Sequence, residues 1–186
     1  MTLSARLTIV SFAAATLRFV STRTARGADP SDTAAVLKNL HDANQMEIVA
    51  GKLAQDKAQS KEVKRFGKTL VTDHASADQK ILKLAKDEKI DLPANPMTSG
   101  EDMKKLQLAT GSEFDRIFVN EMLAGHQKVI ADVKAARDGT GDGKLKQLLS
   151  ATLPVLEKHR QTAQKLVDDL DPSASAAGTN AMPRRE

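Results

Sequence analysis

Three histidines and one glutamate are the residues of this chain whose types could carry chemistry. They are His74, His126, His159 and Glu47. A neutral imidazole is the commonest ligand of transition metals in proteins, and a carboxylate can complete such a site. Three imidazoles and one carboxylate would suit a single Zn, Cu, Fe or Mn ion. The sequence therefore indicates a mononuclear metal site, provided that the four side chains meet in the fold.

Other chemistries lack the residues that they need. The chain has no cysteine, which excludes disulfides, thiolate metal ligands and cysteine nucleophiles. No phosphate loop, Gly-rich cofactor fingerprint or nucleophile constellation occurs in it. A di-iron site would need Glu-x-x-His pairs, but Val71 and Leu156 stand three residues before His74 and His159. We assign no catalytic residue, and a redox metalloenzyme stays open as a third class.

The spacing of apolar residues predicts helices that could position these side chains. Steps of three and four are typical of amphipathic helices, and Ser60 is a good N-cap. The predicted long helices cover residues 31–58, 61–88, 112–139 and 144–169, with a short helical piece over 101–109. Pro93 and Pro96 break the chain between the second and third long helices. Two short turns and one long crossover predict an all-α, ferritin-like antiparallel four-helix bundle made of two hairpins.

Each of the four candidate residues interrupts the apolar seam of its own helix. Glu47 lies about eleven residues before its hairpin turn and His74 about thirteen after it; His126 and His159 lie about eleven before and about fifteen after theirs. At about 1.5 Å of rise per residue, all four fall near one level along the bundle. The sequences around His74 and His159 are also similar, which suggests a duplicated hairpin. His41 stands about 240° round the helix from Glu47, so we expect it to face elsewhere, in solvent.

Two alternatives stay open on the same pattern. Seam histidines can be satisfied by Glu47, by backbone carbonyls or by buried water, which would leave a metal-free structural or interaction module of the cell envelope. Pro154, five residues before His159, removes a helical hydrogen bond to the Ser150 carbonyl. It is interpreted first as a packing bend, and otherwise as a freed carbonyl or a widened gap beside the cluster.

The first 27 residues are typical of an export signal. Arg6 precedes a largely apolar run, Leu7–Leu17, and small residues follow near Ala25–Gly27. An organellar transit peptide is the alternative, since this segment is acid-free and rich in Ser, Thr and Arg. We predict a signal peptide over 1–27, a helical domain over 28–170, a disordered tail over 171–186, and a periplasmic or otherwise exported protein with no transmembrane span in its mature form.

The charge of the chain belongs to this leader. The full chain has 28 Lys+Arg against 24 Asp+Glu, and residues 1–27 hold four arginines and no acid, which leaves 24 of each sign. A mature domain near neutrality, without Trp or Tyr, lacks the basic patch and stacking aromatics that nucleic-acid binding requires. We therefore expect no nucleic-acid partner. An envelope or protein partner is compatible with the composition, which does not fix the oligomeric state.

Several short motifs resemble a known family. They are Met46-Glu47 with Gly51–Ala54, Val63–Phe66 leading into Asp73-His74, Gly111–Asp115, Gly125-His126, and Leu153–His159. Together they are similar to a bacterial ferritin-like family of unknown function, often labelled putative exported or outer-membrane proteins, over roughly residues 32–170. The resemblance implies a ferritin-like bundle and an envelope location. It implies no activity, because none is established for the family as a whole.

Overall fold

The protein is all-helical over the residues that its structure, a computed structural model, describes: 30–94 and 100–171. The five helices in these ranges are α1 (Pro30–Lys57), α2 (Lys61–Asp87), α3 (Glu101–Leu108), α4 (Gly111–Gly139) and α5 (Gly143–Leu170). The helical class is confirmed, and the short α3 matches the piece predicted within the crossover. The predicted signal peptide and nearly all of the predicted tail lie outside the described residues.

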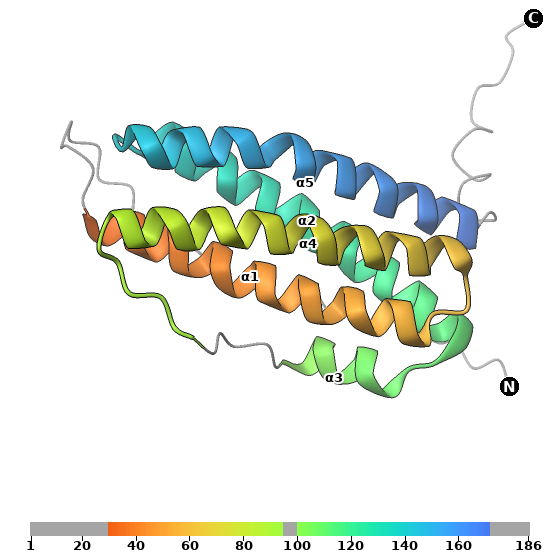
Figure 1. Ribbon diagram of the computed structural model, residues 1–186. Coiled ribbons are helices and arrows are strands. Elements are labelled where there is room, and N and C mark those ends of the chain that lie inside the picture. Colours follow the sequence, from red (N-terminus) through yellow and green to blue (C-terminus); the bar gives the residue numbers. More distant parts are fainter. Residues whose placement is uncertain (1–29, 95–99, 172–186) are drawn as a thin grey trace, which may run out of the picture.

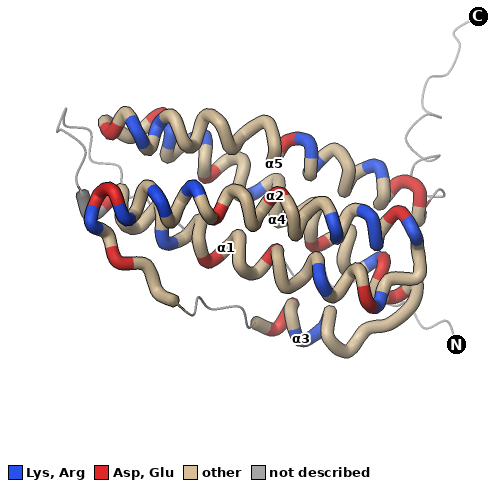
Figure 2. The backbone as a smooth tube through the Cα atoms, in the orientation of Figure 1, with Lys and Arg blue, Asp and Glu red and all other residues tan. Residues whose placement is uncertain are grey.

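The four long helices lie side by side as two antiparallel hairpins (Figure 1). A tight turn joins α1 to α2, and another joins α4 to α5, whereas the segment after α2 returns along the molecule to α3. Between the hairpins, α2 packs on α5 and α1 packs on α4. Basic and acidic residues are interspersed along the helices (Figure 2). No helix in the described ranges is long and apolar enough to cross a membrane.

Side-chain hydrogen bonds fix the turn between α1 and α2. The Ser60 hydroxyl accepts hydrogen bonds from the amides of Glu62 at 3.2 Å and Val63 at 3.3 Å, which confirms it as the N-cap of α2. The Asp115 carboxylate accepts bonds from the amides of Gln59 and Ser60 at 3.0 and 2.8 Å. The buried Asp115 carboxylate therefore ties the start of α4 to the first hairpin.

Two apolar clusters form the core, one toward each end of the long helices. One contains Ala50, Phe66, Phe118 and Ala163; the other contains Val36, Ile81, Ile130 and Leu149. Along every long helix, the candidate residue stands between the segments that feed these two clusters. The ionisable side chains therefore form a polar layer between two apolar ones, a place where unpaired polar groups are costly.

The buried face of α1 differs from the predicted seam. Leu37, His41 and Asn44 are buried, whereas Leu40, Ala43 and Glu47 are half-buried. The cause is the close packing of α1 on α2: a Cβ on Gly51 would lie 2.6 Å from the Gly67 carbonyl oxygen. This approach turns the α2-facing side of α1 inward. The prediction of a solvated His41 is therefore wrong, because that side chain is 5% exposed and packs toward α2.

Candidate metal centre

Three histidines from three helices meet in the polar layer. His74 of α2, His126 of α4 and His159 of α5 are all buried, and their ring centroids lie 5.2 to 5.8 Å apart. One ring nitrogen of each lies within 4.8 Å of the corresponding nitrogens of the other two. Among the described residues, these three side chains form the group whose geometry could hold a metal ion.

Each imidazole is held by one oxygen atom. The Nδ1 of His74 lies 2.8 Å from the Asn44 Oδ1, and the Nδ1 of His126 lies 2.8 Å from the Met122 carbonyl oxygen. The Nε2 of His159 lies 2.9 Å from the Asp73 Oδ2. Amide, carbonyl and carboxylate oxygens accept hydrogen bonds, so each of these nitrogens carries the proton and donates it.

The remaining nitrogen of each neutral ring therefore carries a lone pair. The His126 Nε2 and His159 Nδ1 face each other at 3.3 Å, and the His74 Nε2 is buried without a hydrogen-bond partner. Lone pairs that face each other in a buried layer repel unless a proton or a cation lies between them. Imidazoles fixed by an outer oxygen, with the inner nitrogen free, have the arrangement typical of metal-ligating histidines.

Glu47 lies at the edge of this cluster. Its Oε2 is 3.5 Å from the His74 Nε2, and its Oε1 is 3.7 Å from the His126 Nδ1. The Oε2 is buried and has no hydrogen-bond partner. Burial raises the pKa of this carboxyl, and a positive charge on the nearby His126 would oppose the rise. Glu47 can serve as a fourth ligand or as a counter-charge for two of the rings, but it does not belong to the group within 4.8 Å.

Burial also favours the neutral form of two of the rings. Desolvation, then the neighbouring His126 and His159, hold the pKa of His74 well below its ordinary value. Desolvation lowers the pKa of His159 as well, although its hydrogen bond to Asp73 acts in the opposite direction. Metals bind the neutral imidazole, so the packing selects the form that a metal needs.

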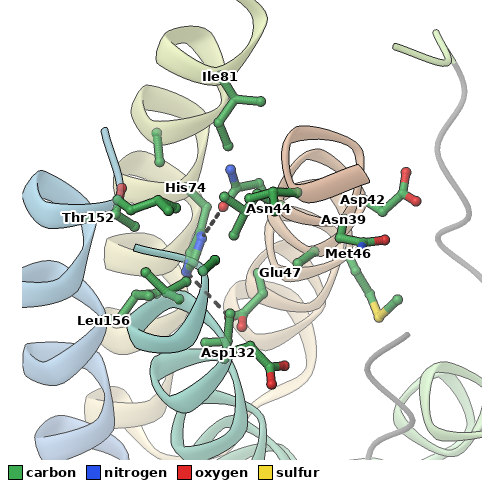
Figure 3. A pocket seen from close by; sticks show the side chains of 18 of the residues that line it. Asn39, Asp42, Asn44, Met46, Glu47, His74, Ile81, Asp132, Thr152 and Leu156 are labelled. Carbon is green, nitrogen blue, oxygen red and sulfur yellow. Dashed lines mark hydrogen bonds and ion pairs between the residues drawn. The ribbon is translucent and has the colours of Figure 1, made fainter. Parts of the chain in front are cut away.

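Two cavities reach the cluster from different sides. One, of about 120 Å³, lies among the long helices and is lined by Glu47, His74 and Asn44 (Figure 3). The other, of about 350 Å³, lies between α2 and α5 and is lined by Asp73, His74 and Pro154. Helix α5 continues through Pro154 to Leu170. Pro154 therefore lines a cavity beside the cluster, and the choice between a packing bend and a widened gap stays a prediction.

Sequence reasoning missed the residues that orient the rings. Asp73 directly precedes His74, and Asn44 stands one helical turn before Glu47, so adjacency and turn spacing were available signals. The Met122 carbonyl is a backbone acceptor one turn before His126, which no residue type reveals. Whether the cluster binds a metal stays a prediction at this point, because the geometry shows the ligands' arrangement alone.

Comparison with known proteins gives a family and no activity. The pattern of the family described as "Domain of unknown function (DUF4142)" matches residues 20–166, and the chain belongs to this family. Neither the curated proteins nor the solved structures contain a match to the chain. The family assignment agrees with a resemblance to a family of unknown function, and it leaves the chemistry of the site to be argued from its geometry.

Proposed function

We propose that this DUF4142 chain binds one transition-metal ion through the His74 Nε2, the His126 Nε2 and the His159 Nδ1. The observation that carries the proposal is the convergence of three unprotonated nitrogens whose rings are each fixed from outside by an oxygen acceptor. A helical core could bury histidines more cheaply by pairing both nitrogens of each ring. Three inward lone pairs are costly without a cation.

The donor set limits the identity of the metal. Imidazole nitrogens suit Zn, Cu, Fe or Mn, and no thiolate is available in the chain. Nitrogen ligands of zinc lie about 2.0–2.1 Å from the ion, which sets them roughly 3.3 Å apart in a tetrahedral site. The His126–His159 nitrogen pair is already at 3.3 Å, so His74 is the ring that would have to move inward. Glu47 or water would complete the coordination.

The wider setting proposed for this site is a ferritin-like four-helix bundle that is exported to the periplasm or envelope. The two hairpins with a long crossover support the fold, and the predicted signal peptide over residues 1–27 supports the export. A buried site without a nucleophile or an assigned general base fits metal holding better than turnover. On this basis we infer a role in metal handling at the envelope.

Thermal unfolding of protein purified without a His-tag tests the proposal. Chelator-treated protein should melt higher after addition of one equivalent of at least one of Zn, Cu, Fe or Mn, because a ligand bound to the folded state alone stabilises it. At free metal about 100 times the Kd, the gain is about 2.7 kcal/mol. A control variant, His41→Gln, should keep the shift. A melt insensitive to all four metals would favour the metal-free interaction module.

A further inference from the structure

The smaller cavity beside Glu47 has the composition of a binding site for a small apolar molecule. Its volume is about 120 Å³, and its walls come from all four long helices, with Leu40, Ile81, Val129, Val133 and Leu156 among the lining residues. Buried cavities of roughly 150 Å³ lined by aliphatic side chains stay dry and bind benzene-sized molecules. A body of about six carbon atoms therefore suits the apolar part of this cavity.

Small residues of α1 and α4 leave open space at the cavity. Ala43 of α1 and Gly125 of α4 both line it. A Cβ built on Gly125 would meet nothing within 4 Å, in contrast to Gly51 and Gly67, where it would clash with backbone. Glycine inside a helix costs roughly 1 kcal/mol relative to alanine, and no close approach of two backbones accounts for Gly125. The open space at Gly125 is a feature that packing alone does not require.

Two acceptors without a donor stand beside this cavity, where Glu47 and His74 line it. The Glu47 Oε2 and the His74 Nε2 are 3.5 Å apart, and both are buried without a hydrogen-bond partner (Figure 3). Both atoms are acceptors, because the His74 proton is on Nδ1, bonded to Asn44. An ammonium group offers three donors and a positive charge, whereas a carboxylate head would set acceptor against acceptor.

The charges along the cavity favour the same head group. Its lining includes the carboxylates of Asp42, Glu47 and Asp132, and no Lys or Arg. Asp42 and Asp132 are each paired with a lysine one turn away, Lys38 and Lys128, both at 2.6 Å. Glu47 is thus the carboxylate of the cavity without a lysine partner. It is also the one at the inner end, beside His74.

We propose that this cavity binds a small apolar primary amine, with its hydrocarbon body between α1 and α4 and its ammonium group on the Glu47 Oε2 and the His74 Nε2. The inference goes beyond metal binding, because the amine would be held by the cavity and these two acceptors in the metal-free protein. With a metal on the three imidazoles, His74 would be engaged and the amine would keep Glu47 alone.

Calorimetric titration of the chelator-treated protein with hexylamine, 1-hexanol and hexanoate tests this inference. Hexylamine should bind with 1:1 stoichiometry, 1-hexanol more weakly, and hexanoate at least tenfold more weakly than hexylamine. Gly125→Leu should fill the cavity and weaken hexylamine at least tenfold. Gly139→Leu, at the other open glycine of α4 and outside the cavity lining, should stay within twofold of wild type.

Three outcomes would overturn the inference: no saturable binding of hexylamine, hexanoate binding as tight as hexylamine, or undiminished binding by folded Gly125→Leu protein. If Gly125→Leu does not fold, Ala43→Leu on the facing helix applies the same test. Because chelator is present throughout, a negative result for the amine leaves the metal proposal standing. A negative metal result likewise leaves the amine titration interpretable.

Discussion

His41 and the cluster of His74, His126 and His159 are all buried, but the ring nitrogens find their partners in opposite ways. His41 has its Nδ1 2.7 Å from the Asp78 Oδ1 and its Nε2 3.2 Å from the Pro93 carbonyl oxygen. Each ring nitrogen of His41 therefore has an oxygen atom as its partner. Gln45 donates to the other oxygen of Asp78 at 2.7 Å. Around His41, neither ring nitrogen is left open to a metal.

In the cluster of His74, His126 and His159, only the ring nitrogens that point outward donate hydrogen bonds to oxygen atoms. Each ring donates outward to one oxygen, and each keeps an unprotonated nitrogen that faces the other two rings. The difference shows that burial of a histidine does not by itself indicate function. What distinguishes the two groups is the direction of the free lone pairs, and only the cluster directs them to one point.

The largest expected effect is on stability, at His41. His41→Leu would leave the buried Asp78 with Gln45 as its remaining side-chain partner, and removing one partner of a buried polar group costs about 1–3 kcal/mol, and more for a carboxylate. We expect the free energy of unfolding in urea to fall by about 3 kcal/mol. Metal affinity, measured by calorimetry, should stay unchanged. A drop in affinity that exceeds tenfold in folded His41→Leu protein would erase the distinction between the two groups.

The next effect is on metal affinity, at His74. His74→Leu removes one of three ligands, and we expect affinity to fall at least 100-fold, or about 2.7 kcal/mol. In chelator, the same variant should lose about 1–2 kcal/mol of stability, because leucine removes the donor of the buried Asn44 Oδ1 and, in partial compensation, the unpartnered Nε2. Calorimetry and urea unfolding on the same preparation give both values. A large fall in the free energy of unfolding with unchanged metal affinity would show that His74 has a structural role, as His41 does.

A smaller effect is expected at the carboxylate that orients His159. Asp73→Ala removes the acceptor of the His159 Nε2 proton, and the loss of such an outer partner typically costs 10- to 100-fold in metal affinity. We expect about tenfold, since the variant leaves all three ligands in place. Asp132→Ala, which alters a half-buried carboxylate of the cavity rim, is the matched control and should leave affinity within twofold.

The smallest effect is expected at Glu121. Its carboxylate is neither fully hydrogen-bonded, as at His41, nor part of the histidine cluster. Its Oε2 has no hydrogen-bond partner, and burial, with Asp102 nearby, raises its pKa to about 7, against the opposing charge of Lys105. The folded state holds this proton more tightly than the unfolded state, so stability falls as pH rises from about 4.5 through 7.

Glu121→Gln should mimic the protonated form and remove this loss. We expect the variant to be more stable than wild type by about 1 kcal/mol at pH 8, a value reduced because half of the side chain is solvated, and nearly equal to it at pH 5. Urea midpoints at the two pH values measure the difference. An equal effect of the substitution at both pH values would show that ionisation of Glu121 is not its cause.

Periodicity predicted much of the fold. Apolar steps of three and four place Phe66, Leu70, His74 and Ile81 on one side of α2, and all four are buried. On α5, steps of three and four through His159 also reach Leu156, Ala163 and Leu166, which are buried. Nearer the start of the helix the same steps reach Leu148 and Thr152, but Leu149 and Leu153 are the buried residues there. On α1 it drifts further, because the contact of Gly51 with Gly67 sets how the helix is rotated, and such a contact between distant glycines leaves no periodic signal.

The candidate ligands of the site could be predicted from the sequence, but the residues that hydrogen-bond to the buried histidines could not be predicted as well. One ionisable residue in each seam, at similar depth, indicated that His74, His126 and His159 could meet, and they lie together in the structure. The role of His41 could not be predicted in the same way. Its acceptors come from another helix, at Asp78, and from the crossover, at Pro93, so tertiary packing decides its environment.

Long-range ¹H–¹⁵N spectra of the imidazoles, recorded with and without Zn²⁺, would show which ring nitrogens carry protons and which bind the metal. In chelator, we expect protons on the Nδ1 of His74 and His126 and on the Nε2 of His159, the opposite tautomer. One equivalent of Zn²⁺ should then shift the other nitrogen of each ring and leave His41 unchanged. Protons on the inward nitrogens, or spectra that Zn²⁺ does not alter, would rule out a metal site built on these three lone pairs.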